Sequence, residues 1–322
     1  MKLTFAPYRL RLLAPVRGVS EREGFVVRIE ESGRTGLGEA SIVPEVGTEP
    51  LEAAREALGR APLRLDELDA LAGTPAARHA VELALLDLAA QREGVPLAKL
   101  LEARAAGSVA VSALLVERAA CGLAREAAAA VAAGFRTVKL KLGADDDYVR
   151  AAVVRDSVGP SVRLRVDANA AWTAEQALRM LRTLAPLGIE LCEQPTADLA
   201  GLEDSPVAIA ADEQVATDLE GALARASVLV LKPMALGGVL PALRLAARAR
   251  GLGKRVVVTT SLDGAIARAG AAHLAAALLA FADEPASGLA TGALFATDVC
   301  ADRLAPRDGR IQLSSEPGLG VA

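Results

Sequence analysis

The chain has 322 residues, of which 52% are apolar and 24% are charged, which is the composition of a globular protein with one or two domains. Its formal net charge of -4, without basic clusters interleaved with aromatic residues, argues against nucleic acid as a partner. The three cysteines are widely spaced and form no CxxC pattern, which excludes a disulfide framework and a zinc site. No apolar run is long enough to span a membrane and no targeting segment is recognisable, so we expect a cytoplasmic protein that does not bind membranes.

The first 60 residues predict a small antiparallel sheet, because apolar residues alternate in Tyr8–Leu12 and again in Phe25–Ile29. A glycine-rich turn is expected after Ile29, followed by Gly36–Glu39. Between Pro75 and Leu101 apolar residues recur at helical spacing, until Gly94 and the proline that follows it interrupt the pattern. These features predict an N-terminal α+β domain that covers residues 1–105.

After residue 105 the sequence alternates between short apolar runs and alanine-rich stretches with helical periodicity. The runs are Val109–Leu115, Thr137–Leu142, Val162–Asp167, Ile189–Glu193, Val207–Asp212, Val228–Lys232, Val256–Thr260 and a weak one within Leu279–Ala290. Several are apolar on both faces, which predicts parallel strands covered by helices, in a closed barrel or an open doubly wound sheet. No GxGxxG or GxxxxGKS/T motif supports the open sheet, so the barrel is favoured for residues 106–302. The tail from 303 to 322 predicts a strand and a loop that return to the first domain.

Ionisable residues lie at the ends of four successive predicted strands. Asp167, Glu193 and Asp212 end three of them, and Lys232 ends the next. In a parallel barrel the carboxyl ends of the strands share one face, which is where barrel enzymes place their sites. Three carboxylates close together repel one another unless a cation neutralises them, so the pattern predicts a bound metal. Oxygen ligands without a His or Cys partner point to Mg²⁺, with Mn²⁺ as a substitute.

Two lysines on the predicted strand Thr137–Leu142 point to a base. Lys139 and Lys141 lie two residues apart and share one face, and the other face is apolar, so a barrel directs both lysines inward. An inward lysine near a divalent cation and a second ammonium has a lowered pKa, which makes the neutral amine available as a base. Lys232, four strands further along, is expected across the barrel mouth from this pair.

Each of these residues also has an ordinary structural interpretation. A Lys-x-Lys pair is common on solvated edge strands, and an Asp at the end of a strand often caps a helix. The joint pattern on successive strands favours an active site over coincidence. Ser261, Asn169 and Gly288 are candidate substrate contacts, with an ordinary loop role as the alternative for each, and Val16–Glu23 is a candidate loop that closes the site.

The sequence resembles the enolase superfamily and, within it, the muconate-lactonizing subgroup. The resemblance rests on motifs spread over nearly the whole chain, namely Thr137–Gly143, Arg165–Trp172, Glu193–Pro195, Ala211–Glu213, Val230–Pro233 and Gly237–Gly238, with Glu39 in a Gly-x-Gly-Glu turn. It implies a modified (β/α)7β TIM-like barrel with an N-terminal α+β capping domain, which the C-terminal tail completes. It also implies Mg²⁺ held by Asp167, Glu193 and Asp212, a catalytic pair Lys141 and Lys232, and Lys139 tuning the pKa of Lys141.

Within that subgroup the sequence most resembles the o-succinylbenzoate synthases, on its length and on the segment Thr259–Arg268. This implies a hydro-lyase of menaquinone biosynthesis that dehydrates 2-succinyl-6-hydroxy-2,4-cyclohexadiene-1-carboxylate to 2-succinylbenzoate through an enediolate. Asp263 and Gly264 depart from the usual Ser-Ser-x-Glu stretch of that family, which leaves the contacts to the succinyl group open.

Two alternatives remain. An N-succinylamino acid racemase or a dipeptide epimerase would use the same two lysines, although the Asp-x-Asp motif usual in the epimerases is missing near Ala282–Pro285. A non-catalytic binding protein on the same fold is an alternative of another class. The two enzyme interpretations share a small carboxylate as the substrate, and an oligomer is compatible with every interpretation.

Overall fold

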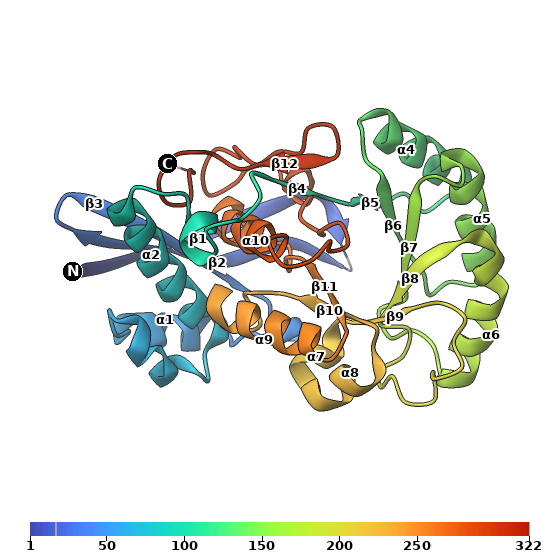
Figure 1. Ribbon diagram of the computed structural model, residues 1–322, viewed down its shortest axis with the longest axis horizontal. Helices are drawn as coiled ribbons and strands as arrows, with labels where there is room; N and C mark the ends of the chain where they lie inside the picture. Colours follow the sequence, from blue (N-terminus) through green and yellow to red (C-terminus); the bar gives the residue numbers. More distant parts are fainter. Residues whose placement is uncertain (17, 322) are drawn as a thin grey trace.

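The computed structural model describes residues 1–16 and 18–321, and it begins with a three-stranded antiparallel sheet. Strands β1 (Lys2–Val16), β2 (Val19–Glu31) and β3 (Arg34–Ile42) pair in chain order (Figure 1). Phe25, Val27 and Ile29 are fully buried on one face of β2, which confirms the predicted alternation. This apolar face is where the first helices pack.

Helix α2 (Pro75–Glu93) covers the sheet, with α1 (Leu51–Gly59) before it and α3 (Leu97–Leu101) after it. The predicted helix break is confirmed, because Gly94 takes a left-handed conformation at the end of α2. The glycine-rich turn expected before Gly36 is at residues 32–33, but the Gly-x-Gly-Glu turn expected at Glu39 is wrong, because Gly36–Glu39 lie inside β3. The glycines instead allow close packing, since a Cβ at position 36 or 38 would overlap a backbone carbonyl oxygen of α2.

A parallel sheet of seven strands forms the wall of a TIM-like barrel, in the order β11-β10-β9-β8-β7-β6-β5. The strands are β5 (Ala113–Leu115), β6 (Thr137–Lys141), β7 (Arg163–Asp167), β8 (Ile189–Glu193), β9 (Ile209–Ala211), β10 (Val228–Leu231) and β11 (Arg255–Val258). Ser287 and Gly288 close the barrel through single bridges to Val111 and Thr259, one on each side. The weak run predicted within Leu279–Ala290 is therefore a closing segment rather than a full strand.

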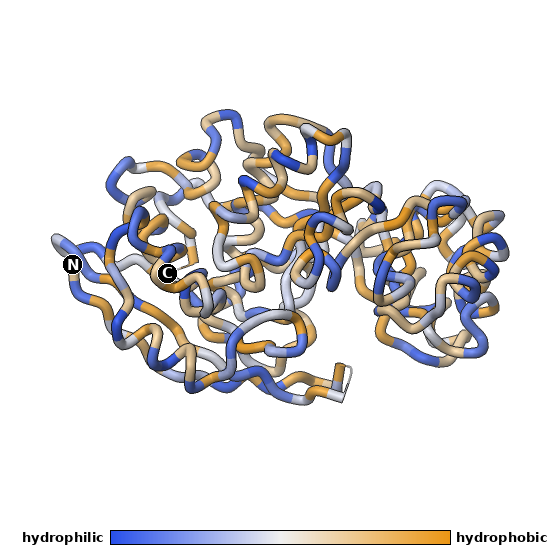
Figure 2. Tube along the Cα trace, turned by 90° about the horizontal axis from the view of Figure 1, so that it is seen from below, coloured by the Kyte–Doolittle hydropathy of each residue, from blue (hydrophilic) through white to orange (hydrophobic). Residues whose placement is uncertain are grey.

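Helices surround the barrel in two groups. They are α4 (Ala120–Ala132), α5 (Asp147–Val158), α6 (Ala174–Leu184), α7 (Glu213–Thr217), α8 (Leu219–Arg225), α9 (Val239–Gly251) and α10 (Ala265–Leu278). In Figure 1, α4, α5 and α6 lie along β6–β8 in one lobe, while α9 and α10 lie in the larger lobe with the N-terminal sheet. Figure 2 shows hydrophilic segments mainly at the outer bends of both lobes.

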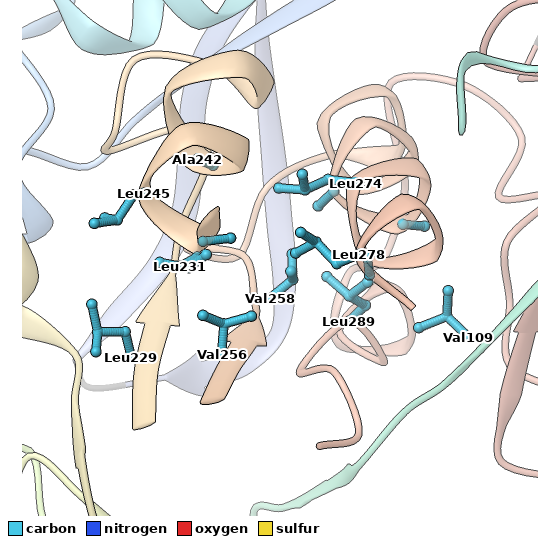
Figure 3. Packing of buried hydrophobic residues seen from close by; sticks show 14 of the residues in the cluster. Val109, Leu229, Leu231, Ala242, Leu245, Val256, Val258, Leu274, Leu278 and Leu289 are labelled. Carbon is cyan, nitrogen blue, oxygen red and sulfur yellow. The ribbon is translucent and has the colours of Figure 1, made fainter. Parts of the chain in front are cut away.

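One buried apolar cluster joins the first domain to the barrel. Figure 3 shows Leu278 of α10 beside Val258 of β11, and Leu245 of α9 belongs to the same cluster. The same cluster includes Leu83 of α2, so the helix of the first domain and the barrel wall share a core. Within the described residues no helix is both long and apolar enough to cross a membrane.

The C-terminal tail lies against the first domain. Strand β12 (Arg310–Gln312) pairs antiparallel with β4 (Ser108–Ala110), and the N–H of Leu97 donates to the carbonyl of Gly318 at 2.8 Å. The run Val109–Leu115, expected to be one barrel strand, is therefore divided, with β4 pairing to the tail and β5 entering the barrel. From these contacts we propose a capping domain of residues 1–105 with the tail 303–322, and a barrel of residues 106–302.

Candidate active site

Two lysines and two carboxylates meet at the carboxyl ends of adjacent strands β6, β7 and β8. Side chains alternate along β6, so Lys139 and Lys141 share one face while the apolar residues between them are buried in the outer wall. Nζ of Lys139 lies 2.8 Å from Oδ2 of Asp167 and 2.6 Å from Oε1 of Glu193. Nζ of Lys141 lies 2.5 Å from the same Asp167 oxygen. One lysine therefore contacts both acids and the other contacts one.

A second ion pair stands across the barrel. Asp212 follows β9 and Lys232 follows β10, and Nζ of Lys232 lies 2.6 and 2.7 Å from the two carboxylate oxygens of Asp212. Strand β10 is four strands from β6 in the sheet order, so Lys232 and Lys141 lie on opposite sides of the mouth. All three lysines line one cavity together with Glu193 and Asp212, and Asp167 is fully buried beside them.

Burial and neighbouring charges shift the pKa values of this cluster in opposite directions. Burial disfavours charge on Lys139 and Lys232, but the adjacent carboxylates outweigh it and raise the pKa of both lysines. Burial, reinforced by the charge of Asp167, raises the pKa of Glu193, whereas the two lysines of β6 lower the pKa of Asp167 despite its burial. These directions reflect the protein groups alone, and the lowered pKa expected for an inward lysine beside a divalent cation and a second ammonium stays a prediction.

The predicted substrate contacts all lie in this cavity, which has a volume of about 130 Å³. Ser261, Asn169 and Gly288 line it, and the buried Oγ of Ser261 makes no hydrogen bond to any of the described residues. Asn169 is engaged already: its Oδ1 accepts from Nζ of Lys141 at 2.9 Å, and its Nδ2 donates to Glu213 at 3.3 Å. Ser261 is thus available to a substrate oxygen, whereas Asn169 orients Lys141.

Arg22 of the first domain also lines the cavity, and the sequence analysis did not identify it as a site residue. Its Nη1 atom lies 3.3 Å from Oε1 of Glu45, while its buried Nε has no hydrogen-bond partner in the part of the chain that the structure describes. The candidate closing loop Val16–Glu23 is mostly strand, because β1 continues to Val16 and β2 begins at Val19, and Arg17 lies outside the described residues. A strand pattern within one domain carries no signal for a contact made in another, which is why Arg22 was missed.

The three acids have the donor chemistry of a site for a hard divalent cation. Asp167, Glu193 and Asp212 are all buried, and Oδ1 of Asp212 accepts no hydrogen bond although Lys232 lies beside it. Among residues 1–16 and 18–321 no three acidic, imidazole or thiol groups gather around one point, and the ammonium of Lys139 lies between Asp167 and Glu193. The residue types fit Mg²⁺ or Mn²⁺, and their role as ligands stays a prediction.

Comparison with known families matches both parts of the chain. Residues 7–102 match the family described as "Mandelate racemase / muconate lactonizing enzyme, N-terminal domain", and residues 122–322 match "Enolase C-terminal domain-like". The chain belongs to the enolase superfamily. This places it in the muconate-lactonizing subgroup that the motifs indicated, and it supports the prediction that the protein is an enzyme.

Relatives within the superfamily have different activities. The o-succinylbenzoate synthase of Thermobifida fusca is 39% identical over 199 residues, which cover 57% of this chain and 61% of that protein. The L-Ala-D/L-Glu epimerase of Bacillus subtilis is 30% identical in an alignment that covers 95% of this chain and 91% of the epimerase. The synthase match is thus higher in identity, and the epimerase match is more complete.

Solved structures are similar to this chain over its whole fold. The substrate-liganded complex of the Bacillus subtilis epimerase matches with a TM-score of 0.89 and 28% identity, covering 100% of this chain and 98% of that one. A dipeptide epimerase from Enterococcus faecalis V583, complexed with Mg and the dipeptide L-Leu-L-Tyr, matches with a TM-score of 0.88 and 26% identity, covering 99% and 98%. The barrel and the N-terminal α+β domain of the enolase superfamily are therefore both present in this chain.

Proposed function

We propose that the chain is a Mg²⁺-dependent o-succinylbenzoate synthase, a hydro-lyase of menaquinone biosynthesis. The observation that carries this proposal is the charge of the cavity. Four cationic side chains line it, namely Arg22, Lys139, Lys141 and Lys232. Among the described lining residues only Glu193 and Asp212 are carboxylates, and a lysine contacts each of them. Such a cavity suits a substrate with two carboxylates and no ammonium group.

The closing segment strengthens the preference for a substrate without an ammonium. From Ala286 to Thr291 it contains no ionisable residue, although Gly288, Ala290 and Thr291 line the cavity. A dipeptide presents an α-ammonium, and burying that charge without a carboxylate partner is costly. A succinyl-cyclohexadiene dicarboxylate has no such group, and Arg22 and the free hydroxyl of Ser261 are placed to receive the oxygens of its distal carboxylate.

The two lysines supply the chemistry from opposite faces. As a neutral amine, Lys141 takes the proton α to the ring carboxylate, and Asn169 holds its Nζ by a hydrogen bond of 2.9 Å. The proton that Lys141 removed passes to the β hydroxyl, which departs as water, so that Lys141 is again a neutral amine and the ring becomes aromatic. Lys232 remains an ammonium on the other face and stabilises the negative charge that develops on the substrate. Mg²⁺ held by Asp167, Glu193 and Asp212 would supply further stabilisation of that charge at the carboxylate.

Turnover of 2-succinyl-6-hydroxy-2,4-cyclohexadiene-1-carboxylate, followed in the ultraviolet with Mg²⁺, tests the proposal. We expect rapid metal-dependent aromatisation by the wild type and a loss of at least about 100-fold in kcat in Lys141→Ala and in Lys232→Ala. The exposed Lys2 provides the control, and Lys2→Ala is expected to keep wild-type activity. A folded wild type that binds Mg²⁺ yet does not turn over this compound would rule out the synthase.

An N-succinylamino acid racemase is the second candidate, because the opposed lysines also suit proton removal from one face and return to the other. The near-complete match to an epimerase favours it, and an N-succinyl group has a carboxylate in place of the ammonium. Incubation of N-succinyl amino acids in D₂O separates the candidates. Exchange of the α proton with racemisation, without turnover of the cyclohexadiene, would identify the racemase.

A further inference from the structure

Glu39 is a buried carboxylate that joins the first domain to the barrel. It lies on β3 with its side chain fully buried, and it accepts three hydrogen bonds. The hydroxyl of Tyr8 donates to Oε1 at 2.8 Å, and the backbone N–H groups of Gly264 and Ala267 donate at 2.6 and 3.0 Å. Two of the three donors therefore belong to the barrel, at the first turn of α10.

Helix α10 begins without a capping side chain of its own. Its N-cap residue is Gly264, and the first N–H groups of a helix have no partner within the helix. Glu39 fills this role from another domain, and Oδ1 of Asp298 accepts from the N–H of Ala265 at 2.7 Å. A Cβ added to Gly264 would lie 2.6 Å from Oε1 of Glu39, so the glycine permits the close approach of the carboxylate.

The segment directly before α10 is a wall of the active-site cavity. Thr260, Ser261 and Leu262 line it, and Gly264 is two residues further along the chain. Leu262 has a φ of +63°, a conformation that leucine holds only when its surroundings enforce it. The contacts of Glu39 with Gly264 and Ala267 lie next to this strained residue and fix the helix from which the wall extends.

We propose that Glu39 is a positioning residue, which uses the capping domain to hold the start of α10 and so places the Thr260–Leu262 wall against the substrate. The inference rests on the proposed function only for the identity of that substrate. Glu39 is remote from the reacting atoms, and it influences substrate affinity through the position of this wall. Glu49 offers a matched comparison, because it is also a buried glutamate that accepts two N–H groups, at 2.9 and 2.8 Å, but at the start of α2.

The test compares Glu39→Gln, Gly264→Ala and Glu49→Gln by two measurements. The first is hydrogen exchange followed by mass spectrometry, which reports on the backbone amides of residues 259–268 whether or not the protein turns over a substrate. The second is steady-state kinetics, which gives KM and kcat. Glu39→Gln replaces one carboxylate oxygen with an NH₂ group that opposes one of the two backbone N–H donors, and Gly264→Ala forces the carboxylate away. We expect both to accelerate exchange in 259–268 and to raise KM for the cyclohexadiene dicarboxylate about tenfold with kcat changed less than about threefold. Glu49→Gln is expected to change exchange near residues 75–78 and to leave KM unaltered.

The two measurements separate this inference from the proposed function. If the wild type does not turn over the cyclohexadiene, the proposed function fails, and the exchange of residues 259–268 still decides whether Glu39 holds the wall. Unchanged exchange in that segment in a folded Glu39→Gln protein would overturn the inference. A lowered melting temperature with unchanged KM would also overturn it, because a purely structural role would give that result. If Glu39→Gln does not fold, Gly264→Ala carries the same test with the carboxylate still present.

Discussion

At the scale of single residues, His273 joins two distant backbone segments through one neutral ring. Its Nδ1 accepts from the N–H of Ala98 at 3.0 Å, and its Nε2 lies 3.2 Å from the carbonyl oxygen of Leu319. Only a ring with its proton on Nε2 satisfies both partners. Burial lowers the pKa of His273 to about 4, against an ordinary value of 6.5. Protonation therefore removes an acceptor and charges a buried ring.

The free energy of unfolding is expected to fall on acidification because of this ring. The unfolded chain binds the proton near pH 6.5 and the folded chain only near pH 4, so the stability is complete above 6.5 and is lost between those values. His273→Gln keeps a donor and an acceptor but does not titrate. We expect urea unfolding at pH 7 and pH 5 to show a loss about 2 kcal/mol smaller in the variant than in the wild type. An equal loss in both proteins would contradict the assignment.

The ionisable residues of the site could be predicted because they obey two local rules. Alternation along β6 places Lys139 and Lys141 on one face, and parallel strands bring their carboxyl ends together. Arg22 and Glu39 obey neither rule, because Arg22 reaches the cavity, and Glu39 the start of α10 beside it, from strands of another domain. The orientation of that domain depends on packing between residues more than 200 positions apart, and the strand pattern does not contain it.

At the scale of elements, the contact between β3 and α2 depends on two glycines. Gly36 and Gly38 lie two apart on the strand, and their positions face the carbonyls of Ala84 and Ala80, one helical turn apart. Two residues along the strand thus match one turn of the helix, so the strand and helix backbones approach closely at both positions. The sequence analysis interpreted the same glycines as a turn, because glycine signals left-handed turns and close approach equally. The position of α2 against β3 shows that these glycines belong to the strand and serve close packing.

Gly38→Ala is expected to destabilise the protein by about 3 kcal/mol or more, because its Cβ would overlap the backbone of α2 and neither backbone can yield locally. Gly59→Ala is the matched control. Gly59 ends α1, and no atom lies within 4 Å of the position that an alanine Cβ would take there, so alanine should be neutral or stabilising by up to about 1 kcal/mol. Urea unfolding of both variants measures the difference. Equal stability of the two variants would show that β3 and α2 can separate without cost.

At the scale of the whole molecule, Asp87 holds three parts of the chain together. From α2 its carboxylate accepts the N–H of Leu37 in β3 at 2.9 Å and the N–H of Leu319 in the tail at 2.8 Å. Burial raises the pKa of Asp87, and the two backbone donors oppose that shift. Sequence patterning predicted that the tail returns to the first domain, and it contained no signal that Asp87 would receive it.

Removal of this carboxylate is expected to weaken the assembly of sheet, helix and tail as a unit. Asp87→Ala leaves two buried N–H groups without an acceptor, at about 1–3 kcal/mol each. Because the capping helix and the barrel share one core, we expect a single, lower thermal transition by calorimetry and by circular dichroism. Asp66→Ala, at an exposed acid paired only with surface arginine, should leave the transition in place. Two separated transitions in the Asp87 variant would contradict a shared core.

The seam of the barrel has a consequence for how new specificities arise in this chain. The closing segment is attached by single bridges at Ser287 and Gly288 rather than by a continuous ladder, yet its residues line the cavity. Substitutions or insertions between Ala286 and Thr291 therefore disturb few backbone hydrogen bonds while altering what the substrate meets. The lysines and acids on the other strands need not change. A combinatorial library confined to this segment would therefore change which substrates the protein accepts while its lysines and acids stay the same.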